Sequence, residues 1–295
     1  MMVVTGFGHV LIEEEGEPGC DPRPFLKQRK NRKYMGTQDD LAVVSAGMAL
    51  ASAGLVESDL GDRAGLYLSV GHIPFERCDV DPVLAASIDD EGEFSLRRFA
   101  DEGHRRAHPL TAFRCLPNMP AFHISANFDL RGSYMVSYPG AGQVYALLDE
   151  AEAALREGRV DVALVGGVAC QRNFLVEHHF RRIRPAVAPE RLRDAGALLV
   201  LETQAHAKAR GARIRGRCVR RSLEYRAFDA REALFEQVEE LGSDATHMRR
   251  LELSLGPASL PWALSSSWGE GRAARVVHRL ESRDGVLAES VWVSA

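Results

Sequence analysis

The sequence has few of the features that mark special classes of protein. Its five cysteines are scattered and odd in number, and none forms a Cys-x-x-Cys pair. This fits reduced thiols in a cytoplasmic protein better than a disulfide framework. The longest apolar stretch, residues 162–170, contains two glycines and is far too short to span a bilayer. The first residues lack a basic region and turn acidic, so we expect neither a signal peptide nor a membrane partner.

The charge balance also argues against a specialised role. Lys and Arg number 37 and Asp and Glu number 41, which gives a formal net charge of −4 and no sign of a nucleic-acid partner. Apolar residues make up 45% and charged residues 26%, as is ordinary for a folded soluble protein. A chain of 295 residues can bury a sizeable core without disulfides or metals.

Apolar runs alternate with helical patterns over most of the chain. Residues 1–12, 64–71 and 160–168 read as strands, whereas 37–54 and 142–157 have helical spacing and end at glycines. This alternation predicts α/β layers around a mainly parallel sheet.

The last part of the chain has a different pattern. The acidic segment 229–241 predicts a helix that begins at an N-cap aspartate. The apolar segments 273–280 and 286–293 flank Asp284-Gly285, a dipeptide typical of a hairpin turn. We therefore expect antiparallel pairing at the end of the chain.

Several motifs that could hold a metal or a cofactor are incomplete. His104 and His108 have i, i+4 spacing but lie among arginines and have no adjacent third ligand, which favours a solvated basic face. Gly6-Phe7-Gly8 lacks the third glycine of a dinucleotide loop. We therefore expect no metal and no cofactor.

The most informative segment is a strand, a tight turn at residues 139–142 and a long helix. This arrangement places a nucleophile at a helix N-terminus, where the dipole and the free N–H groups would lower a thiol pKa and stabilise an oxyanion. The turn, however, contains Ala141 between two glycines and no Cys, Ser or Thr.

The segment Asn118–Gly167 resembles the N-terminal half of a β-ketoacyl synthase, a condensing enzyme with the thiolase fold. The resemblance rests on Asn118-Met119, His123, Leu130-Arg131-Gly132, the turn Pro139-Gly140-Ala141-Gly142, Asp161-Val162 and Gly166-Gly167. In this ungapped register the family's acylated cysteine falls on Ala141. The resemblance implies a thiolase-like layered αβαβα fold with a degenerate, shortened C-terminal half, divided into residues 1–225 and 226–295.

The resemblance also shows what is missing. The stretch 263–272 is similar to the family's terminal motif, with Trp268 and Glu270 at its gate-like positions. The two motifs that carry the family's catalytic histidines find no match, since 226–261 contains only His247. The second half therefore lacks on the order of a hundred residues, which is the size of a domain.

The resemblance points most directly to a chain length factor, the noncatalytic partner of an active ketosynthase in type II polyketide synthases. The family's subunit interface implies contacts at Ser133, Tyr134, Met135, Val136, Ser137 and Tyr138. Candidates for lining the acyl tunnel are Leu110, Thr111, Phe113, Met119 and Phe122, although ordinary core packing explains each of them as well.

Other interpretations stay open. The chain could be a scaffold or regulator without a tunnel role, or an enzyme that uses Cys115 or Cys170 as nucleophile; a decarboxylase that relies on Gln143 would require a two-residue slip of the register. A basic block at 208–221 could contact an acidic acyl carrier protein, but a solvated face balanced by the acidic segment after it explains the same pattern.

Overall fold

The computed structural model describes residues 1–12, 20–182, 188–226, 235–242, 248–252, 255–281 and 285–295. Within these ranges, ten strands form one hydrogen-bonded sheet with two halves. The strands of the first half are β1 (Met2–Ile12), β2 (Ala64–Val70), β3 (Tyr134–Ser137), β4 (Val162–Ala169) and β5 (Asp194–Thr203). The strands of the second half are β6 (Gly216–Tyr225), β7 (Phe235–Leu241), β8 (Met248–Glu252), β9 (Arg275–Glu281) and β10 (Val286–Ser294).

The strand order is β3-β2-β4-β5-β1-β6-β10-β9-β7-β8, and a single residue pair, Val4 with Gly216, connects the two halves between β1 and β6. Only the pairs β2–β3 and β2–β4 are parallel. The expectation of a mainly parallel sheet is therefore wrong: β5 runs against both of its neighbours, and the second half is antiparallel throughout. The hairpin expected between β9 and β10 is present.

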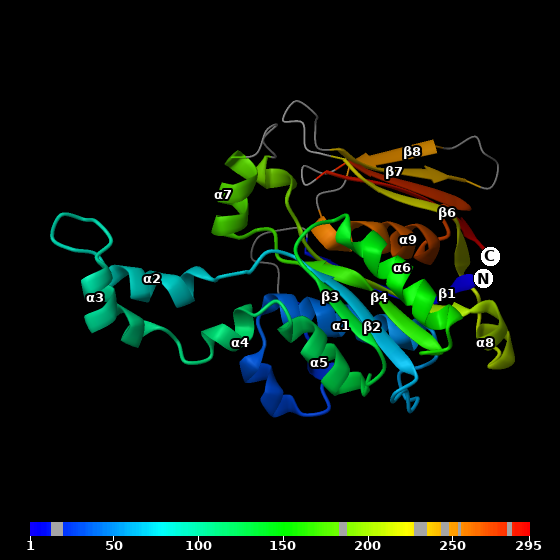
Figure 1. The fold of residues 1–295 in the computed structure, drawn as a ribbon, viewed down its shortest axis with the longest axis horizontal. Helices are drawn as coiled ribbons and strands as arrows, with labels where there is room; N and C mark the ends of the chain where they lie inside the picture. Colours follow the sequence, from blue (N-terminus) through cyan, green and yellow to red (C-terminus); the bar gives the residue numbers. More distant parts are fainter. Residues whose placement is uncertain (13–19, 183–187, 227–234, 243–247, 253–254, 282–284) are drawn as a thin grey trace.

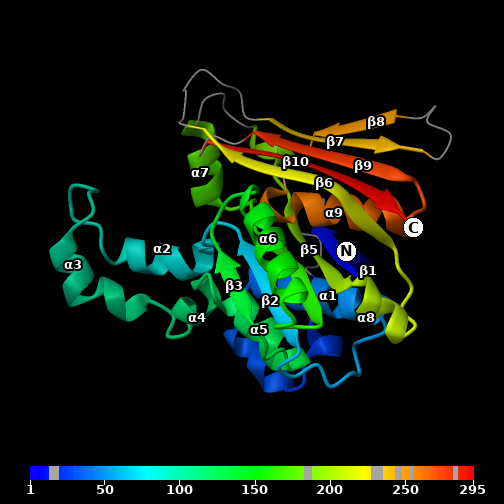
Figure 2. The ribbon, with the colours of Figure 1, turned by 45° about the vertical axis from the view of Figure 1, so that its right-hand side comes forward.

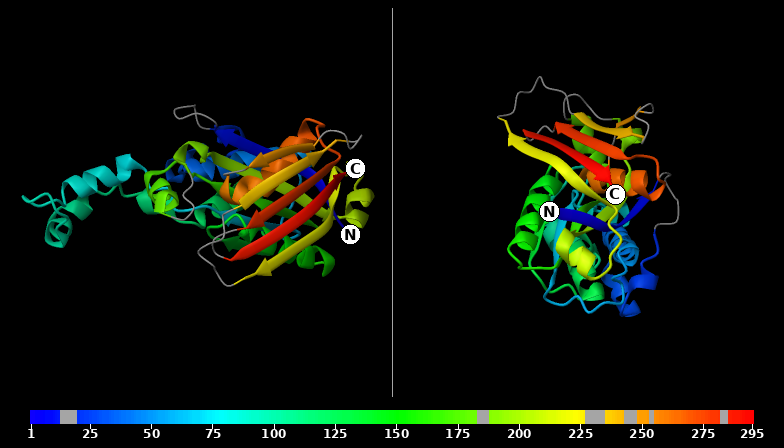
Figure 3. Two further views of the ribbon diagram at one scale, coloured as in Figure 1. Left: turned by 90° about the horizontal axis from the view of Figure 1, so that it is seen from above. Right: turned by 90° about the vertical axis from the view of Figure 1, so that its right-hand side faces the viewer.

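Helices cover the outer face of the first half and fill the space between the halves (Figures 1 and 2). The outer helices are α1 (Thr37–Ser52) and α5 (Met119–Phe128), and the central ones are α6 (Gln143–Arg156) and α9 (Ser259–Gly269). The remaining helices are α2 (Arg77–Ala85), α3 (Leu96–Asp101), α4 (Thr111–Cys115), α7 (Phe174–Arg182) and α8 (Gln204–Ala209). The arm that carries α2 and α3 projects from the body, as Figure 3 shows from above. None of the described helices combines the length and apolarity that crossing a membrane requires.

Two apolar clusters hold these layers together. One lies between the sheet halves, where α6 buries Leu147, Leu148, Ala151 and Leu155, the face expected from the sequence pattern. The other lies between the first half and its outer helices. The apolar strand β4 is buried along its whole length because helices cover both of its faces.

The second half repeats the strand order of the first, β8-β7-β9-β10-β6 against β3-β2-β4-β5-β1, but β7 runs in the opposite direction. Between β7 and β8 lie only residues 242–247. A parallel crossover needs a dozen residues or more, so this short connection allows only antiparallel pairing. The helix expected over 229–241 is wrong for 235–241, which form β7, while 227–234 lie outside the described residues.

Candidate functional site

The turn between β3 and α6 links the end of the strand directly to the start of the helix. The Gln143 N–H donates to the Gly140 carbonyl at 3.1 Å, and α6 begins at Gln143. A Cβ at Gly142 would lie 2.5 Å from Cγ1 of Val286 on β10, so the second half of the sheet packs directly against this turn. Ala141 is half-buried against the central core. Its methyl group cannot attack an acyl carbon or hold a proton.

A buried polar cluster lies behind the turn, and the sequence patterns did not reveal it. The Tyr145 hydroxyl is 2.7 Å from Nδ1 of His278 and 3.0 Å from Oγ of Ser290. Nε2 of His278 is 3.1 Å from Oε1 of Glu236. Burial raises the pKa of Tyr145 far above its ordinary value. Because Tyr145, His278 and Ser290 are all almost fully buried, the cluster joins α6 to the second half and does not face substrate.

His123, the histidine of the family pattern, lies inside the first half on α5. Its side chain is 1% exposed, and neither ring nitrogen has a hydrogen-bond partner among the described residues. Burial lowers its pKa from 6.5 to about 4, although the nearby Tyr34 backbone opposes this shift. The imidazole is therefore neutral at physiological pH.

The tunnel candidates are divided between the interior and the surface. Met119 is buried at the start of α5, and Leu110 and Thr111 are half-buried around the start of α4. Phe113 is 45% exposed and Phe122 is 54% exposed. Two aromatic side chains of this set thus face solvent and remain available for contact with a partner.

The expected interface strand β3 is an edge of the sheet. It pairs with β2 on one side, and no described residue pairs with its other side. Tyr134 is 75% exposed, Met135 41% and Tyr138 43%. Ser133, Val136 and Ser137 are half-buried. An unpaired edge with exposed apolar side chains is a typical template for association.

Beside Tyr138, the structure brings together an aromatic cluster that the sequence did not predict. The His72 ring centroid is 6.0 Å from that of Tyr138 and 5.1 Å from that of His179 on α7. Burial lowers the pKa of His72, and the neighbouring His179 adds to this effect. The members come from three distant segments, so no local spacing signals the cluster.

The cysteines proposed as alternative nucleophiles lie in unfavourable surroundings. Burial raises the pKa of Cys115 to about 11 and that of Cys170 well above its ordinary value. A thiol reacts as the thiolate, so burial leaves both poorly reactive at neutral pH.

One group of side chains has the spacing of a metal site. Ligand atoms of Glu76, Cys78 and Asp79 lie within 4.8 Å of one another. However, Asp79 accepts from Arg114 at 2.7 Å, and Glu76 accepts from the Thr37 hydroxyl at 3.3 Å. A cation would have to compete with Arg114, so these residues are explained without one.

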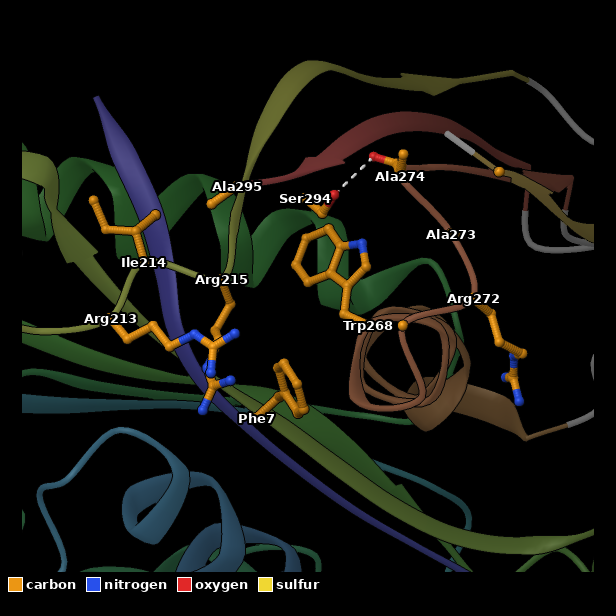
Figure 4. A pocket seen from close by; sticks show the side chains of 12 residues that line it. Phe7, Arg213, Ile214, Arg215, Trp268, Arg272, Ala273, Ala274, Ser294 and Ala295 are labelled. Carbon is orange, nitrogen blue, oxygen red and sulfur yellow. Dashed lines mark hydrogen bonds between the residues drawn. The ribbon is translucent and has the colours of Figure 1, made fainter. Parts of the chain in front are cut away.

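The gate-like residues lie at the junction of the two sheet halves. Trp268 lies in the last turn of α9 and lines a pocket there together with Phe7. Glu270 is exposed and forms an ion pair with Arg272. Figure 4 shows the Trp268 indole in this pocket, which the sequence did not predict.

The basic block does not form a single surface. Arg210 pairs with the buried Glu202, and Arg221 pairs with Asp149 and Glu152 of α6. The other cations of the block are Lys208, Arg213, Arg215, Arg217 and Arg220. The carboxylates that balance these cations thus lie on several elements and not on an acidic helix after the block.

Comparison with known proteins identifies the family. Residues 9–197 match the family model described as the N-terminal domain of beta-ketoacyl synthases, and the chain belongs to this family. It is 27% identical over 228 residues to nodulation protein E of Rhizobium sp. (strain N33), an alignment that covers 72% of the chain and 52% of that protein. The chain therefore spans about half the length of this curated relative.

Solved structures show the same fold at low identity. A chain from a type II polyketide synthase acyl-carrier protein in complex with its ketosynthase superposes with a TM-score of 0.71 at 15% identity, covering 100% of this chain and 99% of that one. A chain of the ishigamide ketosynthase/chain length factor gives 0.65 at 18% identity, with the same coverage. The thiolase-like α/β fold expected from the sequence is confirmed.

Proposed function

We propose that the chain is a noncatalytic ketosynthase-like subunit, a chain length factor, that pairs with an active ketosynthase in type II polyketide or fatty-acid-like biosynthesis. Its contribution is the shape of the acyl tunnel at the subunit interface. An acyl carrier protein is a second possible partner, because carrier-bound chains must reach that interface.

One observation carries this proposal: a methyl group stands where the fold presents its nucleophile. The turn at residues 139–142 keeps its approach to α6, yet Ala141 offers no reactive atom. His123, the histidine of the family pattern, is buried on α5 and not on α6, the helix that follows the turn. In the proposed role, this turn therefore contributes no nucleophile.

The free edge of β3 supports association. Around it, α4 and α5 expose Phe113 and Phe122, and the arm with α2 and α3 projects on the same side of the molecule (Figure 1). A partner that continues the sheet at β3 would cover these side chains. Bulky residues at such an interface limit chain length, because overpacking by a longer chain costs about 1–3 kcal/mol.

The similar structures support the choice of partner. One contains an acyl-carrier protein with its ketosynthase, and another is described as a ketosynthase/chain length factor. A scaffold without a tunnel role would also use the β3 edge, but it would leave product length unchanged when the subunit is exchanged.

A proline substitution at the free edge tests the interface. The Ser133 carbonyl accepts from Leu66 of β2, so in the alternating pattern of a strand the Tyr134 N–H is directed to the free edge. Tyr134→Pro removes this donor without removing a β2–β3 bond. Tyr134→Ala removes the side chain alone and is the matched control.

The measurement is native mass spectrometry after co-expression with a ketosynthase encoded beside this gene. We expect a one-to-one complex with the wild type, a weakened one with Tyr134→Ala and none with Tyr134→Pro. A complex of normal strength with folded Tyr134→Pro would contradict an interface at β3, and a wild-type chain that binds no ketosynthase would contradict the proposed function.

A further inference from the structure

A pocket lies where the two halves of the sheet meet, away from the β3 edge. It has a volume of about 460 Å³, within the range of small-molecule sites. Its walls come from β1, the segment before β6, the end of α9 and the residues that follow it, and the last residues of β10 (Figure 4). We call it the seam pocket.

The described residues that line the seam pocket include three arginines and no aspartate or glutamate. Arg213 and Arg215 enter it from one extended segment, their guanidinium groups overlap in the view of Figure 4, and the charge of Arg213 acts on Arg215. Within the described part of the chain, no carboxylate pairs with either one. Among the described residues, the Arg215 guanidinium donates only to the Ser52 carbonyl, at 3.5 Å, and its Nε has no partner.

Several other partly buried arginines have carboxylate partners. Arg114 is 2.7 Å from Asp79, and Arg221 is 2.5 Å from Asp149. The third arginine of the seam pocket, Arg272, pairs with Glu270. Arg215 is partly buried and has no carboxylate partner among the described residues, so it and the exposed Arg213 give the pocket a positive charge that an anionic ligand would balance.

The opposite side of the pocket is aromatic. The Trp268 ring lies in the pocket and offers it a flat apolar surface. The Phe7 ring lies 5.5 Å from the Arg215 guanidinium carbon and holds that side chain in place.

We propose that the seam pocket binds a phosphate-bearing small molecule, with its phosphate on Arg213 and Arg215 and its flat or apolar part against Trp268 and Phe7. Guanidinium groups present paired N–H donors that match phosphate oxygens, and two adjacent ones favour a doubly charged group. Burial lowers the pKa of Arg215, and the neighbouring charge of Arg213 adds to this effect; a bound anion would relieve both. The site does not depend on the proposed pairing with a ketosynthase.

Calorimetric titration of the full chain with three probes tests the proposal. AMP carries a phosphate and an aromatic ring, inorganic phosphate carries only the charge, and adenosine only the ring. We expect saturable binding of AMP, weaker binding of phosphate and none of adenosine. Equal binding of adenosine and AMP, or no saturable binding of either phosphate-bearing probe, would overturn the proposal.

Two variants locate the site. Arg213→Gln alters an exposed side chain and should fold normally, and it should weaken AMP binding at least tenfold. Arg217→Gln, an exposed position two residues beyond Arg215, is the matched control and should bind AMP as the wild type does. Unchanged affinity in Arg213→Gln, or an equal loss in both variants, would show that the anion does not bind in the seam pocket.

Discussion

His123→Leu should make the protein more resistant to acid. The imidazole is enclosed in the first half, and its pKa of about 4 lies below the ordinary value of 6.5 because burial disfavours the charged ring. Below pH 6.5, His123 is therefore protonated in the unfolded chain but stays neutral in the folded chain until the pH approaches 4. Leucine has a similar size, cannot titrate and leaves no buried nitrogen without a partner.

The magnitude follows from the two pKa values. Their difference corresponds to about 3 kcal/mol, at about 1.4 kcal/mol for each pKa unit. Above pH 6.5 this titration does not affect the free energy of unfolding of the wild type. As the pH falls from 6.5 to about 4, the free energy of unfolding decreases because only the unfolded chain takes up the proton. Over this range the variant should gain about 3 kcal/mol relative to the wild type.

Urea unfolding followed by tryptophan fluorescence at pH 7, 6, 5 and 4 measures this difference. His178→Leu is the control, because it removes an exposed imidazole by the same substitution. If the free energies of unfolding of wild type and His123→Leu stay parallel from pH 7 to pH 4, the ring takes up its proton in the folded protein, and the account of its burial is wrong.

Two further predictions concern the turn and its support. Tyr145→Phe leaves His278 and Ser290 without the hydroxyl between them and should lower the free energy of unfolding by about 1–3 kcal/mol, more than Tyr67→Phe, whose hydroxyl has one side-chain partner; equal losses in urea unfolding would contradict this. Ala141→Cys alone should give no condensation of carrier-bound acyl groups, because the two motifs that carry the family's catalytic histidines find no match in the sequence, and turnover in a mass-spectrometric product assay would show that an active base had been overlooked.

Much of the first half of the fold can be predicted from the sequence. Residues 64–71 and 160–168 are continuous apolar runs, and they form β2 and β4, which are buried on both faces. The period of 3.6 in 142–157 identifies α6. In these segments the apolar pattern of the sequence matches the observed burial, so the pattern alone identifies the strand or helix.

The second half could not be predicted in the same way, because its polar residues lie inside. Segment 235–241 is rich in glutamate, which favours a helix. Instead, Glu240 accepts from the Ser267 hydroxyl at 2.6 Å, and Glu236 lies beside His278. These partners come from α9 and β9, and pairing with β9 overrides the local preference.

The candidate site and the seam pocket also differ in how far a local sequence pattern predicts them. The turn with Ala141 follows from one local strand–turn–helix pattern, whereas the interface role of residues 133–138 was expected from the family resemblance and their edge position comes from the structure. The seam pocket does not follow from such a pattern, because Phe7, Arg213 and Trp268 come from three distant segments. Only the meeting of β1 with β6 brings them together.

In the described part of the chain, no helix covers the outer face of the second half of the sheet. The side chains on that face explain why the sheet does not need such a layer. Ion pairs connect side chains across four strands of that face, from β6 through β10 and β9 to β7: Arg220, Glu289, Arg279 and Glu239. On the same face Val277 and Val291 are each only 4% exposed. The ion pairs are partly exposed on their arginine side, so they give the sheet a face that water can solvate. An antiparallel sheet tolerates one solvated face, and its inner face packs against α6 and the turn at Ala141 in the central apolar cluster.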